Sequence, residues 1–251
     1  MSNYRFLVFA IWLCWSVPSS GQDTAQPLPV DRPLKILLIG NSLTYTNSLS
    51  TPLTSFAAAA AASQPRTWRV TEQTMANAKL SQMWALRTTE QLLNNEPWDY
   101  IVLQENGNIP DVYPQGLFSA ARDFNDAAKK IGAKVVLFEN WRRHADAQVK
   151  VTELFAKLGK ELDVTVAPIG QAWQLVIVAD PSIQLREADG VHPSAAGTYI
   201  AACVIFLTIA NADVCPQVLY GSIDEHVSSV AREAAQKAVA NSRAALLRHP
   251  S

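Results

Sequence analysis

The stretch LKILLIGNSLTYTN, Leu34 to Asn47, joins an apolar run to small polar residues. Apart from Lys35, its first part is a hydrophobic run, which is typical of a strand buried on both faces in a parallel sheet. The run ends abruptly at Gly40, Asn41 and Ser42. In an open parallel sheet, residues just beyond the carboxyl end of a strand lie where ligands bind. The stretch therefore predicts a buried strand that ends either in a plain turn or in a functional serine.

Strand-like and helical segments alternate along the rest of the chain. Four further strands are expected at residues 67–74, 99–105, 133–140 and 164–170. Helices are expected in seven segments, 51–63, 79–95, 116–132, 146–163, 171–180, 193–211 and 224–247. In 79–95 the apolar residues recur at helical spacing. Strands separated by helices predict a parallel sheet covered on both faces. We therefore expect an α/β protein, a flavodoxin-like three-layer α/β/α sandwich around a five-stranded parallel sheet, with the alternating strand 67–74 at a half-exposed edge.

Composition and the amino terminus bound the class of protein. The chain has 251 residues, is 49% hydrophobic and carries a formal net charge of -1 without a basic cluster, so nothing favours nucleic acid or an anionic membrane. Residues 1–21 combine one arginine, a short apolar core and small residues, the layout of a secretory signal, although an uncleaved anchor is the alternative. We expect a linker at 22–33, one domain at 34–251, and a secreted or periplasmic mature protein that is not inserted in a membrane.

Two cysteines remain after this leader, Cys203 and Cys215. Outside the cytoplasm they could form a disulfide, and two free thiols, with Cys203 buried in a helix, are equally consistent with the sequence. There is no CxxC pair and no His, Asp or Glu set with the spacing of metal ligands, so we expect neither a metal nor another cofactor.

A second motif near the carboxyl terminus supplies partners for the serine. The segment EADGVHPSAAG contains Asp189 and His192, three residues apart. A serine hydroxyl is a weak nucleophile until a base removes its proton, and a histidine oriented by a carboxylate is such a base. Ser42, His192 and Asp189 are thus candidates for acyl-transfer chemistry.

The order of these motifs resembles the SGNH, or GDSL-type, hydrolases. The resemblance rests on Gly-x-Ser-Leu-Thr near the start and Asp-x-x-His-Pro near the end, and it covers most of the mature chain. Asn41 and the segments AKVVLFENW and VAPIGQAW are similar to a subgroup with Gly-Asn-Ser in place of Gly-Asp-Ser. The resemblance implies Ser42 as nucleophile, His192 as base and Asp189 as its orienting acid.

The same resemblance implies a three-donor oxyanion hole. The first donor is the backbone N–H of Ser42. The second falls on Asn77, where the family has glycine, and asparagine tolerates a positive φ better than most residues. The third is a side-chain amide, for which Asn108 and Gln104 are both candidates.

Four further polar or aromatic residues allow two interpretations each. Arg142 and Arg143 could bind a substrate carboxylate or form a solvated pair, and Trp141 could stack on a sugar or pack at the sheet edge. Glu105 could be a second acid, but a turn carboxylate is the better interpretation.

These observations predict a serine esterase that hydrolyses O-acyl esters of a small molecule or glycan, with short or acetyl acyl groups. The alternatives are a lipase, thioesterase or acyltransferase of the same fold, or a non-catalytic SGNH-fold protein that binds glycan.

Overall fold

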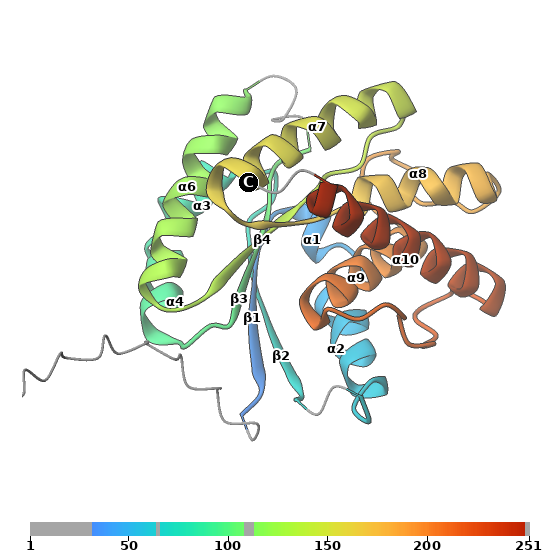
Figure 1. Cartoon of the computed structure of the whole chain (residues 1–251), viewed down its shortest axis with the longest axis horizontal. Helices are drawn as coiled ribbons and strands as arrows, with labels where there is room; N and C mark the ends of the chain where they lie inside the picture. Colours follow the sequence, from blue (N-terminus) through green and yellow to red (C-terminus); the bar gives the residue numbers. More distant parts are fainter. Residues whose placement is uncertain (1–31, 64–65, 108–112, 249–251) are drawn as a thin grey trace, which may run out of the picture.

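The computed structural model describes residues 32–63, 66–107 and 113–248. Its centre is one parallel sheet with the strand order β2-β1-β3-β4-β5 (Figure 1). The strands are β1 Leu34–Gly40, β2 Trp68–Thr74, β3 Tyr100–Gln104, β4 Lys134–Phe138 and β5 Thr165–Ala167. This order is that of flavodoxin-like folds, so the expected three-layer sandwich is confirmed.

Helices cover both faces of the sheet. One layer contains α2 Ser50–Ala59, α8 Ile169–Ala179, α9 Ala195–Ala210 and α10 Glu225–Arg248. The other contains α3 Leu80–Trp84, α4 Arg87–Asn95, α6 Pro114–Lys130 and α7 Ala145–Leu162. Figure 1 shows α3, α4 and α6 on one side of the strands, and α2, α9 and α10 on the other.

The alternation of side chains along each strand builds two separate cores. In β1, Ile36 and Leu38 pack into the α2–α9 layer, whereas Leu37 and Ile39 pack into the α3–α6 layer. Because both faces are buried there, the strand is continuously apolar from Ile36 to Ile39. The edge strand β2 is mostly half-buried along its length, which confirms the interpretation of its alternating sequence.

Residues 79–95 form two helices, not the single helix expected from their apolar spacing. The first helix ends at Trp84, and Leu86 has an extended backbone that starts α4 anew. A side-chain hydrogen bond ties the first turn of α4 to the sheet, because Gln73 Nε2 on β2 donates to Thr88 Oγ1 at 2.8 Å. The contact comes from another element, and for this reason local periodicity does not reveal it.

Cys203 in α9 and Cys215 in the loop that follows form a disulfide, and both residues are buried. Within the described ranges, no helix combines the length and the apolar character needed to cross a bilayer. The expected leader, and all but the last two residues of the expected linker, lie outside the described residues.

An ionic cluster closes the amino edge of the sheet. The Asp99 carboxylate, 5% exposed, accepts hydrogen bonds from the Arg32 guanidinium at 2.6 and 2.9 Å and from Lys35 N at 2.8 Å. Arg66 lies at 3.4 Å from the same carboxylate. The start of the described chain is thereby fixed at the amino edge of the sheet, opposite the carboxyl edge where β1 ends at Gly40.

Candidate active site

Ser42 lies immediately past the carboxyl end of β1, as the first residue of the short helix α1, Ser42–Tyr45, and is half-buried. Asn41 caps this helix and is buried. Its Oδ1 accepts from Leu43 N at 3.0 Å, and its Nδ2 donates to Ala78 O at 2.9 Å. The asparagine side chain therefore joins the serine loop to the loop after β2.

Gln104 is buried beneath this turn. Its Oε1 accepts from Asn41 N at 2.9 Å and from Thr44 Oγ1 at 3.0 Å, and its Nε2 donates to the Glu105 carbonyl. A Cβ on Gly40 would come within 2.6 Å of Gln104 Oε1, which explains the glycine before Asn41. The Gln104 amide is thus enclosed and bonded within the fold, which favours Asn108 over Gln104 as the third donor.

Asp189 and His192 form a closed pair on one loop. His192 Nδ1 lies 2.6 Å from Asp189 Oδ2, while Val191 N and His192 N donate to Asp189 Oδ1 at 2.8 and 3.0 Å. The hydrogen bond from His192, followed by those from the backbone, lowers the pKa of Asp189 to about 2. Because Asp189 holds Nδ1, the other ring nitrogen, Nε2, is the one left for a nucleophile.

The serine and histidine loops are tied together beside the candidate site. Asn47 Nδ2 donates to Pro193 O at 2.8 Å and to Glu187 Oε1 at 3.2 Å, and Tyr220 donates to the Asn47 carbonyl. The structure brings Asp189 to His192 directly. In the described part of the chain, no hydrogen bond joins Ser42 Oγ to His192.

The two expected backbone donors have suitable surroundings. Asn77 has φ +56°, the left-handed conformation that suits asparagine or glycine. Among residues 32–63, 66–107 and 113–248, the N–H groups of Ser42 and Asn77 have no protein acceptor.

Asn106 Nδ2 donates to Asn77 Oδ1 at 2.8 Å and to Asn77 O at 3.1 Å, a contact that sequence reasoning missed. The only signal was the position of Asn106 directly after a strand end. Asn108 lies outside the described residues.

Glu105 is a structural carboxylate. It is buried, and its Oε1 accepts from Leu80 N at 3.1 Å and from Asn106 N at 2.6 Å. Burial raises its pKa, although these hydrogen bonds oppose the rise. Glu105 therefore holds the start of α3 and the Asn106 turn together, which agrees with the turn interpretation.

Trp141 packs inside the protein at the end of β4. It is 7% exposed and stacks on Trp173 with ring centroids 4.1 Å apart and planes 4° apart. This contact favours packing over sugar stacking. The neighbouring Arg142 is fastened by its backbone, because Arg142 N donates to Gln148 Oε1 at 2.7 Å.

A second buried carboxylate, Glu139, lies between β4 and α8. Its oxygens accept from Gln148 Nε2 at 2.8 Å, Thr152 Oγ1 at 2.9 Å and Gln171 Nε2 at 2.8 Å. Burial raises the pKa of Glu139 to about 7, although these bonds favour the ionised form. The network fixes the elements that follow the strand end, and Glu139 itself is 1% exposed.

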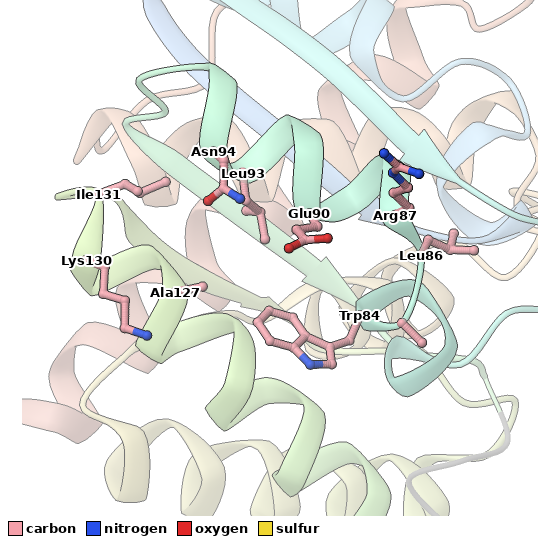
Figure 2. Close-up of a pocket in the computed structure, with 10 residues that line it drawn as sticks. Trp84, Leu86, Arg87, Glu90, Leu93, Asn94, Ala127, Lys130 and Ile131 are labelled. Atoms are coloured by element: carbon pink, nitrogen blue, oxygen red, sulfur yellow. The ribbon is translucent and has the colours of Figure 1, made fainter.

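A separate hollow of about 530 Å³ lies between α4 and α6. Figure 2 shows Trp84, Leu93 and Ala127 around it, together with the polar side chains of Glu90 and Lys130. Ser42, Asp189 and His192 do not line it, so this hollow is distinct from the candidate active site.

No protein-family model matches the sequence, and no curated protein is similar to it. Solved structures do resemble it. A candidate SGNH hydrolase from Slackia heliotrinireducens is 26% identical with a TM-score of 0.61, over 71% of this chain and 100% of that one. A DUF4886 family protein from Bacteroides uniformis is 17% identical with a TM-score of 0.69, over 83% of this chain and 95% of that one.

An acetyl-xylooligosaccharide esterase from a Geobacillus species, in a mutant form, is 16% identical with a TM-score of 0.56, over 71% of this chain and 94% of that one. Other similar structures are a GDSL-like lipase and a psychrotrophic esterase. None of these matches tests the assignment to the Gly-Asn-Ser subgroup. The chain has the fold of the SGNH hydrolases.

Proposed function

We propose that the protein is a secreted serine esterase of the Gly-Asn-Ser subgroup that hydrolyses short O-acyl esters of a small molecule or carbohydrate through the triad Ser42, His192 and Asp189. The observation that carries the proposal is the Asp189–His192 pair, 2.6 Å apart, on a loop that Asn47 fastens to the serine loop. That arrangement supports His192 as the base for Ser42 and Asp189 as the acid that orients it.

In the proposed first half-reaction, Ser42 Oγ attacks the ester carbonyl while His192 Nε2 takes the hydroxyl proton. The Asp189 carboxylate stabilises the imidazolium that forms, and with a pKa of about 2 it is ionised throughout the working range of an esterase. His192 then protonates the departing alcohol, which leaves an acyl group on Ser42. In the second half-reaction, water gives its proton to His192, attacks the acyl group and releases the acid.

The negative charge that develops on the carbonyl oxygen needs donors already aimed at it. We assign this role to the N–H groups of Ser42 and Asn77, which have no acceptor in the described residues. Asn106, bonded to Asn77, keeps that residue in its left-handed conformation. Asn108 remains our candidate for the third donor.

Three observations support the choice of substrate and compartment. One similar structure is an esterase of acetylated xylooligosaccharides, which favours acetyl esters of carbohydrate. The leader-like residues 1–21 favour export, and the Cys203–Cys215 disulfide suits an oxidising compartment.

The test is hydrolysis of p-nitrophenyl acetate, together with covalent labelling by a fluorophosphonate. Wild type should hydrolyse the ester and take up the label at Ser42, and Ser42→Ala should do neither. Ser81→Ala, at an exposed position on α3, is the matched control and should behave as wild type. Equal activity in wild type and Ser42→Ala would reject the proposal, and a folded wild type that is inactive but binds glycan would support the non-catalytic alternative.

A further inference from the structure

Two arginines border the loop that carries Asp189 and His192. Arg143 follows β4 and is exposed, and its Nη2 lies 2.7 Å from the position that a Cβ on Gly190 would occupy. Gly190 is the residue directly after Asp189 and has φ +71°. The guanidinium of Arg143 therefore lies against the backbone of the catalytic loop itself.

Arg186 lies at the start of the same loop. Its backbone forms an antiparallel bridge with Pro193, the neighbour of His192, and Glu187 N donates to His192 O at 2.9 Å. Its guanidinium carbon lies 5.1 Å from the ring centroid of the buried Trp173. Burial, and next the positive charge of Arg143, hold the pKa of Arg186 below its ordinary value. The two like charges are therefore close enough to influence each other.

In the described part of the chain, neither guanidinium has an acidic partner. Within the described ranges, Arg143 and Arg186 form no hydrogen bond or ion pair. The nearby carboxylates have other partners, since Asp189 accepts from His192 and Glu187 accepts from Asn47. Two neighbouring cations without a counter-charge repel each other, and a bound anion would remove that repulsion.

We propose that Arg143 and Arg186 bind a carboxylate of the substrate, so that the preferred esters carry an acid group close to the acylated hydroxyl, as an O-acylated uronic acid does. The guanidinium group suits this ligand because its planar fork can donate two parallel hydrogen bonds to a carboxylate. The inference rests on the proposed esterase function and adds the charge of the substrate to it.

The experiment compares two acetyl esters that differ in charge, 3-acetoxybenzoate and 3-acetoxybenzamide, and repeats the comparison with the 4-substituted isomers. The measured quantity is the ratio of kcat/KM for the anionic ester to that for the neutral ester. The intrinsic reactivities of the two esters are the same for every variant, so a change in this ratio reports binding of the carboxylate. The variants are Arg143→Gln and Arg186→Gln, with Arg87→Gln on α4 as the exposed control far from the loop.

We expect the ratio to fall about tenfold in Arg143→Gln for at least one isomer pair, and to keep its wild-type value in Arg87→Gln. If Arg186→Gln does not fold because of its contact with Trp173, Arg143→Gln decides alone. Ser42-dependent hydrolysis with an unchanged ratio in Arg143→Gln for both isomer pairs would overturn this inference only. Hydrolysis that does not depend on Ser42 would overturn the proposed function, and this inference with it.

Discussion

At the scale of single residues, Asn41 has a chemical property that the aspartate of Gly-Asp-Ser lacks. It accepts from Leu43 N and also donates to Ala78 O, and it is 2% exposed. We predict that Asn41→Asp lowers the free energy of unfolding by about 1–3 kcal/mol, because a buried carboxylate oxygen would face a carbonyl. Urea denaturation measures the loss. Asn241→Asp, exposed on α10, is the control, and equal stability of Asn41→Asp and wild type would contradict the prediction.

Gln104 and Asn108 are distinguished by comparing activity with stability. Gln104→Ala should reduce both kcat and the free energy of unfolding, the latter by about 1–3 kcal/mol, because Asn41 N and Thr44 Oγ1 would lose their buried acceptor. Asn108→Ala should reduce kcat by about 10²–10³ with little change in KM or stability, if it is the third oxyanion donor. Wild-type kcat in Asn108→Ala would leave the two backbone N–H groups as the whole oxyanion hole.

The candidate site was only partly predictable from the sequence. Short motifs predict Ser42, Asp189 and His192, and the structure places the last two together. The direction of the Gln104 amide depends on a turn 63 residues earlier in the chain, where Asn41 N donates to its oxygen. A contact of that kind leaves no local pattern, so the sequence does not reveal that the Gln104 amide is bonded within the fold.

At the scale of secondary-structure elements, the Cys203–Cys215 disulfide fastens α9 to the loop after it. The double variant Cys203→Ala/Cys215→Ala should lose about 3 kcal/mol of unfolding free energy, chiefly because its unfolded chain is less constrained. Urea denaturation of the variant, and of wild type with and without reductant, measures this. Titration of two free thiols in denatured, unreduced wild type would show that the bridge does not form.

The elements also mark the limit of sequence periodicity. Alternation of strands and helices predicted the layers correctly because β1 to β4 are long enough to show their own patterns and turn residues separate them from the helices. The break between α3 and α4 was not predicted, since the apolar spacing continues across it and the side-chain contact from Gln73 to Thr88 lies on another element.

At the scale of the whole molecule, the stability should depend on pH through Glu139. Its pKa is about 7 in the folded protein and 4.5 without the protein's influence, so between these values the folded state holds a proton that the unfolded state has released. The free energy of unfolding should therefore fall as pH rises from 4.5 to 7, by about 3 kcal/mol in total, and then level off.

Urea denaturation across this pH range tests the effect of Glu139. Glu139→Gln cannot titrate, so its stability should lack this part of the decline, whatever its absolute value. Glu90→Gln, an exposed carboxylate on α4, should keep the wild-type slope. Identical slopes in wild type and Glu139→Gln would show that Glu139 has an ordinary pKa.

The ionic cluster of Arg32, Arg66 and Asp99 determines the orientation of the protein when its amino-terminal side is attached to a surface. It fixes the entry of the chain at the amino edge of the sheet, while Ser42 follows the carboxyl edge of the seven-residue strand β1. At about 3.3 Å per residue, the strand separates the two edges by roughly 23 Å. An affinity resin, a fusion partner or a surface anchor joined ahead of Arg32 would thus lie at the edge of the sheet opposite Ser42. The candidate active site would then face away from the attachment point and stay open to polymeric substrates.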